Sequence, residues 1–116
     1  MTNNLPEKGF YYHWKHAPHG PITDGAYEVL GTAWNTEAVD FKSENPADFL
    51  ESEVVVYRPL YKEALVYVEG KKFWLRLLKN FMQKMEKDGR TVDRFIKVTD
   101  PKIISELEKI RDEMYK

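Results

Sequence analysis

The stretch from Val54 to Tyr61 constrains the fold of this chain more than any other. Its sequence, VVVYRPLY, has three consecutive valines and two tyrosines, which are residue types that favour β-strands. Both alternating sets of positions are largely apolar, so both faces of this strand favour burial over contact with water. The segment therefore predicts a strand inside a sheet, covered on both sides. Pro59 has no amide hydrogen to donate, and we expect regular pairing to end there.

Composition limits the classes of function. The 116 residues support one compact domain, and 42% hydrophobic with 32% charged residues is typical of a globular protein. The 18 basic and 19 acidic side chains nearly cancel, so no overall field attracts nucleic acid or an anionic membrane. Without cysteine there is no disulfide framework and no thiolate zinc site. Residues 1–8 lack a signal-peptide core and no run reaches membrane-spanning length, so we expect a cytoplasmic protein with no membrane partner.

Two more strands are expected before the central one. Residues 10–15 alternate between two faces, and residues 26–34 form the second strand, in which Gly31 predicts a bulge. Residues 16–25 contain two prolines and two glycines, which predicts a long loop. Residues 35–51 are expected to be an excursion with at most one helical turn.

After the central strand, the pattern predicts more β-structure. Residues 64–68 are expected to extend a ribbon. Residues 71–77 are expected to form a strand with Phe73, Leu75 and Leu77 facing inward and the intervening side chains on the opposite face.

Residues 77–89 are ambiguous. Their apolar side chains recur at helical spacing, and Asp88-Gly89 would then end a helix. The same dipeptide is also a strong hairpin turn, with residues 91–98 as the return strand. Periodicity alone leaves both interpretations open.

The end of the chain predicts an amphipathic helix. Asp100 is a suitable N-cap and Pro101 suits the first helical position. One stripe is apolar and consists of Ile103, Leu107, Ile110 and Met114. We expect it to pack on its own sheet, which favours a monomer over a dimer formed through this helix.

Three groups of residues, in this order, resemble a known family. They are Lys8–Lys15 with Tyr27–Gly31, then Val56–Tyr61, then Trp74–Arg76 with Phe81, Asp88-Gly89 and Arg94-Phe95. Together they resemble DUF1653, a small bacterial and phage domain family with motifs Y-x-H-Y-K, V-x-Y-x-x-L-Y, R-P-L-x-x-F and R-F. The resemblance runs over about residues 8–98. The chain departs from it in longer loops at 16–24 and 38–52, and in Leu77, where the family tends to have proline.

The resemblance implies an SH3-like small β-barrel or roll, here of five to six strands followed by the C-terminal helix. It also implies a short helical turn at residues 78–82 and then a hairpin over Asp88-Gly89. The expected organisation is a flexible N-terminus (1–8), a DUF1653-like β-barrel domain (9–99) and a helix packed on the barrel (100–116). The family brings no established activity.

Six polar side chains at or near these motifs form the candidate binding cluster: His13, Lys15, Glu37, Tyr57, Arg58 and Arg76. On one face they would bind an anionic ligand or a peptide end, since arginine among aromatic rings is a common binding anchor. The alternative is a network of half-buried charges that satisfy one another. We expect Arg58 or Arg76 to pair with Glu28, Glu37 or Glu53.

The three histidines follow an H-x-x-H-x-x-H spacing at His13, His16 and His19. Strand positions three apart point to opposite faces, so a metal site would require the loop to fold back. We therefore expect exposed loop histidines, no metal and no cofactor.

The predicted function is a non-catalytic module that binds a small anionic ligand, a peptide or a protein. One alternative is a binder of single-stranded nucleic acid, in which aromatic rings near Lys15, Lys72 and Arg76 stack bases. Another is a small hydrolase or transferase that uses His13 with Glu37. Binding is favoured over catalysis because the serines occupy no recognisable triad or elbow and there is no Gly-rich phosphate loop.

Overall fold

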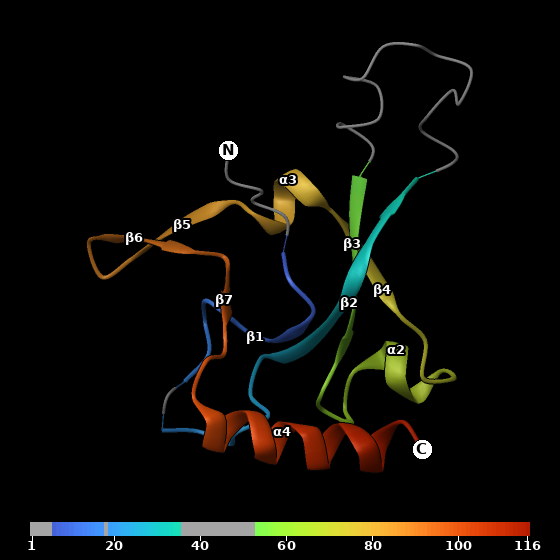
Figure 1. Cartoon of the computed structure of the whole chain (residues 1–116). Coiled ribbons are helices and arrows are strands. Elements are labelled where there is room, and N and C mark those ends of the chain that lie inside the picture. The colour runs from blue at the N-terminus through green and yellow to red at the C-terminus, as the bar shows by residue number, and fades with distance from the viewer. Residues whose placement is uncertain (1–5, 18, 36–52) are drawn as a thin grey trace.

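The computed structural model describes residues 6–17, 19–35 and 53–116, which form a mainly β fold with a C-terminal helix (Figure 1). The strands in these residues are β1 (Gly9–His13), β2 (Ala26–Trp34), β3 (Glu53–Pro59), β4 (Trp74–Leu77), β5 (Lys84–Lys87), β6 (Arg90–Asp93) and β7 (Phe95–Lys97). The helices are α2 (Leu65–Val68), α3 (Leu78–Phe81) and α4 (Pro101–Met114). The predicted fold class is confirmed, whereas the predicted excursion at 35–51 lies almost wholly outside the described residues.

Five strands form one antiparallel sheet in the order β4-β3-β2-β1-β7, and β5 and β6 form a separate ribbon. The described strands do not close into the expected SH3-like barrel, because β4 and β7 remain the two edges of the sheet. The predicted single return strand, 91–98, is also wrong. It breaks at Arg94, whose amide bonds to Gln83 in the ribbon while its carbonyl accepts from Trp14 beside the sheet.

The central-strand prediction is confirmed, since β3 pairs with β2 on one side and with β4 on the other and ends at Pro59. Buried residues lie on both faces of the sheet. One core consists of Tyr11, Val29, Val55, Tyr57, Phe81 and Phe95. The opposite core, which faces α4, consists of Phe10, Ala26, Leu60, Val98 and Leu107.

Gly31 forms the predicted bulge in β2. The register between β2 and β3 shifts between Val29 and Gly31, and the glycine has φ of 151°. Such a conformation is accessible to glycine and unfavourable for residues with a Cβ.

The ambiguous stretch resolves as the family resemblance implies. Its first part is the short helix α3, and the second is an antiparallel hairpin in which Met85 lies opposite Val92. The turn residues Asp88 and Gly89 both have positive φ, 53° and 77°, as a two-residue hairpin turn requires. The prediction of a hairpin in place of a long helix is confirmed.

Two predictions near β4 are wrong. Residues 65–68 form the helix α2, in which the amide of Val68 bonds to the carbonyl of Ala64. The inward and outward faces of β4 are reversed, because Leu75 is 66% exposed. Pairing of Trp74 with Tyr57 puts the tryptophan and Arg76 on the aromatic face of the sheet.

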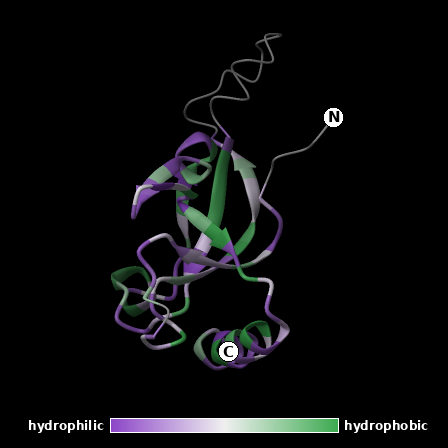
Figure 2. Cartoon of the chain, turned by 90° about the vertical axis from the view of Figure 1, so that its left-hand side faces the viewer, coloured by the Kyte–Doolittle hydropathy of each residue, from purple (hydrophilic) through white to green (hydrophobic). Residues whose placement is uncertain are grey.

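Helix α4 begins as predicted, with Asp100 accepting a hydrogen bond from the amide of Lys102 and Pro101 in first position. Leu107 is buried in the core between α4 and the sheet, and Met114 is also buried, so the apolar stripe is covered by its own chain. Figure 2 looks along α4 and shows it as a separate layer beneath the curved sheet. None of the helices in the described residues has the length and apolar character needed to cross a bilayer.

Candidate functional site

The sheet divides the predicted cluster between its two faces. Tyr57 and Arg58 are neighbours in β3 and therefore point to opposite sides. Tyr57, Arg76 and His13 lie together on the face of the sheet whose core includes Tyr11, Phe81 and Phe95. Arg58 lies on the face that packs against α4. Glu37 falls outside the described residues.

The three residues that meet line a hollow of about 310 Å³, which we call the aromatic pocket. All five strands of the large sheet contribute to its lining, which consists of His13, Tyr27, Tyr57, Trp74, Leu75, Arg76 and Phe95. The motifs that carry the family resemblance, which are far apart along the chain, thus converge at one place. The reason is the strand order, which brings the start of β7 beside β1 and β4 beside β3.

Aromatic rings form the floor of this pocket. Tyr57 lies edge-on to Tyr27, with ring centroids 5.5 Å apart, and tilted against Trp74 at 5.9 Å. Its third neighbour is Phe95, also at 5.9 Å. The Tyr27 hydroxyl shares a hydrogen bond of 2.8 Å with Tyr61, and burial is the main cause that raises its pKa above the ordinary value. The floor is therefore rigid and neutral, since these rings hold one another in place.

Arg76 supplies the charge of the pocket. Its Nε donates to the Tyr57 hydroxyl at 3.2 Å, and its guanidinium carbon lies 5.5 Å from the centroid of the Phe95 ring. The side chain is half-buried, yet within the part of the chain that the structure describes it has no carboxylate partner. An arginine without a counter-ion in aromatic surroundings is suited to bind an anion.

His13, which also lines the aromatic pocket, lies in a positively charged environment. Its ring meets the Phe95 ring edge-on at 5.4 Å, and its Nδ1 accepts from the amide of Lys15 at 3.3 Å. Burial is the largest cause that lowers the pKa of His13, followed by the positive charges of Arg94, Lys15 and Arg76. The electrostatic environment of His13 is therefore positive, and of these groups His13 and Arg76 line the pocket.

Arg58 has a structural role on the other face. Its Nε and Nη2 each lie 2.8 Å from Oε1 of Glu28, which confirms the prediction that Arg58 or Arg76 pairs with Glu28, Glu37 or Glu53. Its guanidinium also lies 4.0 Å from the ring centroid of Tyr115. It does not belong to the aromatic pocket.

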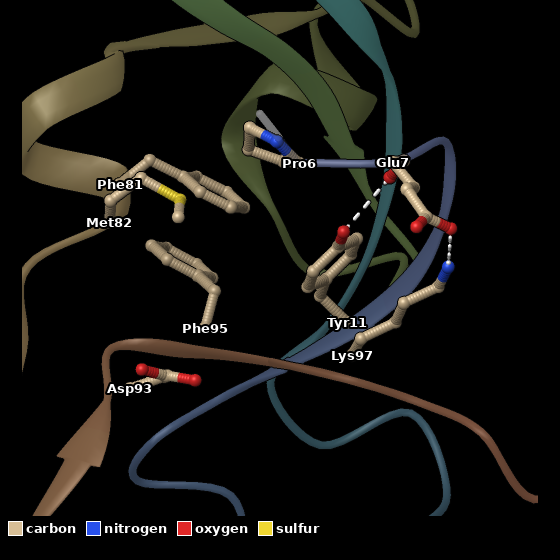
Figure 3. Close-up of a pocket in the computed structure, with 8 residues that line it drawn as sticks. All are labelled: Pro6, Glu7, Tyr11, Phe81, Met82, Asp93, Phe95 and Lys97. Atoms are coloured by element: carbon tan, nitrogen blue, oxygen red, sulfur yellow. Dashed lines mark hydrogen bonds and ion pairs between the residues drawn. The ribbon is translucent and has the colours of Figure 1, made fainter. Parts of the chain in front are cut away.

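A second hollow, of about 220 Å³, lies beyond Phe95 (Figure 3). Its aromatic wall is the parallel stack of Phe81 and Phe95, with centroids 4.3 Å apart. Its charges are already paired, since Lys97 donates to Glu7 at 2.5 Å and Asp93 contacts Lys84. It therefore has less free charge to offer a ligand than the aromatic pocket.

Of the two loop histidines, His16 makes contacts that stabilise the loop. The ring of His16 stacks on Tyr12 with centroids 3.7 Å apart, and its Nδ1 lies 2.6 Å from the carbonyl of Asp24. His19 is exposed. Among residues 6–17, 19–35 and 53–116, no three His, Cys, Asp or Glu side chains gather closely enough to hold a metal ion.

The predicted cluster lacks four residues of the pocket, Tyr27, Trp74, Leu75 and Phe95. Their places depend on which strands pair and in which register. Strand alternation alone could have separated Tyr57 from Arg58.

Comparison with known proteins gives one result. Residues 9–97 match the family described as Protein of unknown function (DUF1653). No curated protein and no solved structure matches the chain.

Proposed function

We propose that this chain, which belongs to the DUF1653 family, is a non-catalytic binding module. Its aromatic pocket would receive an anionic group of the ligand. The observation that carries this proposal is the state of Arg76. It is a half-buried arginine that contacts a hydroxyl and a ring and has no carboxylate partner among the described residues.

Two other half-buried arginines, one in the sheet and one in α4, provide a contrast. Arg58 and Arg111 both bond to the carboxylate of Glu28, at 2.8 and 3.0 Å. A guanidinium has five N–H donors, and at Arg76 one of them is directed to Tyr57. The remaining donors suit a carboxylate or phosphate, which arginine binds through two parallel hydrogen bonds.

The surroundings strengthen this preference for anions. Lys15 and Arg94 add positive charge that acts on His13. The walls are aromatic, and charge–charge interactions are stronger next to such groups than in bulk water. A volume of about 310 Å³ lies at the lower end of the roughly 300–1,000 Å³ typical of ligand sites, so it suits one acidic group or side chain.

The proposal predicts direct binding of small anions at Arg76. Sodium acetate and sodium phosphate, titrated at constant ionic strength, should shift the NMR signals of the Arg76 Nε–H and the Trp74 indole N–H. Arg76→Gln should abolish the response of Trp74. Lys102→Gln removes the same charge from an exposed position on α4 and should leave that response intact. The proposal fails if neither anion moves these signals, or if both variants respond alike.

A further inference from the structure

We propose that the ligand is an extended acidic peptide segment of a partner protein, which adds as a strand to the free edge of β4 and inserts a carboxylate into the aromatic pocket. This inference rests on the proposed function and names the partner class for that site. It follows from the edge of the sheet, the exposed side chains on that edge and the charge around it.

Strand β4 is the last strand on one side of the large sheet. It pairs with β3 through Trp74–Leu77, and among the described residues no strand covers its outer side. The outward backbone N–H and C=O groups of such an edge are a template for another strand. Peptide recognition by strand addition uses these groups for affinity and the neighbouring side-chain pockets for specificity.

Two apolar side chains at this edge are open to solvent. Edge strands are commonly protected by charged side chains, proline or a covering element, and the one charge in β4 is Arg76, which an acidic strand would neutralise. Leu75, which lies opposite Val56 of β3, is 66% exposed, and Phe73, which precedes β4, is 55% exposed. An added strand would bury both its backbone edge and this apolar surface.

The positive charge around β4 favours an acidic partner. Residues 71–84 carry five cations and no acidic side chain, in a chain whose formal net charge is −1; the cations are Lys71, Lys72, Arg76, Lys79 and Lys84. Of these, Lys84 pairs with Asp93, and the other four have no carboxylate partner in the described parts of the chain. A cationic edge with an unpaired arginine is complementary to an acidic strand.

The alternation of β4 defines the pattern of that strand. By strand alternation Trp74 and Arg76 share the face of Tyr57, whereas Leu75, which also lines the pocket, shares the face of Val56. Residues directly opposite one another on paired strands share a face, with Cβ atoms roughly 4.5–5.5 Å apart. The peptide should therefore alternate acidic side chains over the pocket with apolar side chains beside Leu75.

Two other candidate partners fit the β4 edge and the aromatic pocket less well. Single-stranded nucleic acid needs open ring faces for stacking, but Tyr57 is 4% exposed and its ring is enclosed by Tyr27, Trp74 and Phe95. A second copy of the chain would bring two cationic segments together, and like charges on paired strands are destabilising.

The test uses the full chain and the capped peptide acetyl-Val-Glu-Val-Glu-Val-amide, with acetyl-Val-Lys-Val-Lys-Val-amide as its matched control. We expect the acidic peptide to shift the NMR signals of the Trp74–Leu77 amides and to slow hydrogen exchange of the outward-facing ones. N-methylation of the peptide amides that face β4 should abolish binding, whereas methylation of the alternate amides should not. Arg76→Gln should weaken binding about tenfold or more, and Lys102→Gln should not.

Each other outcome overturns the inference in a recognisable way. If acetate moves the Arg76 signal but the acidic peptide does not bind, the pocket stands and strand addition fails. Equal binding of the lysine peptide would refute the acidic preference, and binding of an oligothymidylate in place of the peptide would favour nucleic acid. Protection of the β4 edge in the free protein, with sedimentation at twice the monomer mass, would identify a second copy as the occupant.

Discussion

Glu28 and Arg58 face each other across β2 and β3, with two nitrogens of the arginine each 2.8 Å from the same carboxylate oxygen. The second oxygen of Glu28 accepts from Nη1 of Arg111 in α4 at 3.0 Å. One buried carboxylate therefore joins two strands of the sheet to the C-terminal helix. The interaction accounts for both arginines on this face, whereas Arg76, on the other face, has no carboxylate partner among the described residues.

Replacing this carboxylate should destabilise the fold. Glu28→Gln leaves two partly buried guanidinium groups without a counter-ion, and we expect the free energy of unfolding to fall by roughly 2–4 kcal/mol. Equilibrium unfolding in urea measures this free energy. Glu106→Gln removes a carboxylate from an exposed ion pair with Lys109 and should cost at most about 1 kcal/mol. If the two variants lost the same small amount, the Glu28 network would not join the helix to the sheet.

The contact between α4 and the sheet can be tested at Leu107. This side chain is fully buried between the helix and the sheet, so Leu107→Ala should leave a cavity and cost roughly 2–5 kcal/mol. Ser105→Ala changes an exposed position of the same helix and is the control. Because the stripe packs within its own chain, the melting temperature should not depend on protein concentration. A midpoint that rises with concentration would instead indicate that α4 packs between chains.

The bulge in β2 predicts a purely conformational cost. At Gly31 an added Cβ would meet no atom within 4 Å, so a steric clash is not expected. Its φ of 151° is nevertheless unfavourable for alanine, and Gly31→Ala should reduce the free energy of unfolding by roughly 1–3 kcal/mol. Thermal unfolding monitored by circular dichroism provides the measurement. A variant as stable as the original chain would show that the bulge relaxes to another register.

Local sequence patterns predicted the parts of this fold that depend on neighbouring residues. The extent of β2, its bulge at Gly31 and the capped helix after Asp100 follow from residue types at short spacing. For the turn at Asp88 such patterns left helix and hairpin open, and the family resemblance favoured the hairpin. The faces of β4 could not be predicted this way. Three of its four side chains are apolar, so its orientation depends on pairing with β3, which lies across a helix and a turn.

The candidate site was predicted in part for the same reason. His13, Tyr57 and Arg76 do meet, but they come from three strands whose order is a long-range property of the chain. Arg58 was grouped with Tyr57 because the two are adjacent in sequence, although a strand directs adjacent residues to opposite faces. The prediction that involves Glu37 stays untested, since that residue lies outside the described part.

His13 gives the aromatic pocket a predicted pH dependence. Burial, and then the charges of Arg94, Lys15 and Arg76, lower its pKa in the folded protein below the value of about 6.5 expected in the unfolded chain. Between these two pKa values the unfolded chain binds more protons, so stability rises with pH. The contribution of His13 is complete above about pH 6.5 and is lost as pH falls through the folded-state pKa.

An anion bound beside Arg76 should reverse this effect, because negative charge favours the imidazolium. Acetate should therefore raise the pKa of His13, and its affinity should increase as pH falls from the His13 pKa of the acetate-bound protein toward that of the free protein. The NMR signal of the His13 Cε1–H, followed from pH 8 to pH 5, measures the pKa of His13 with and without acetate. This range extends about one and a half pH units to either side of the ordinary histidine pKa. Arg94→Gln should raise the pKa of His13 more than Arg76→Gln, following the order of their effects. A pKa at or above the ordinary value in the free protein, or one that acetate leaves unchanged, would contradict the cationic pocket.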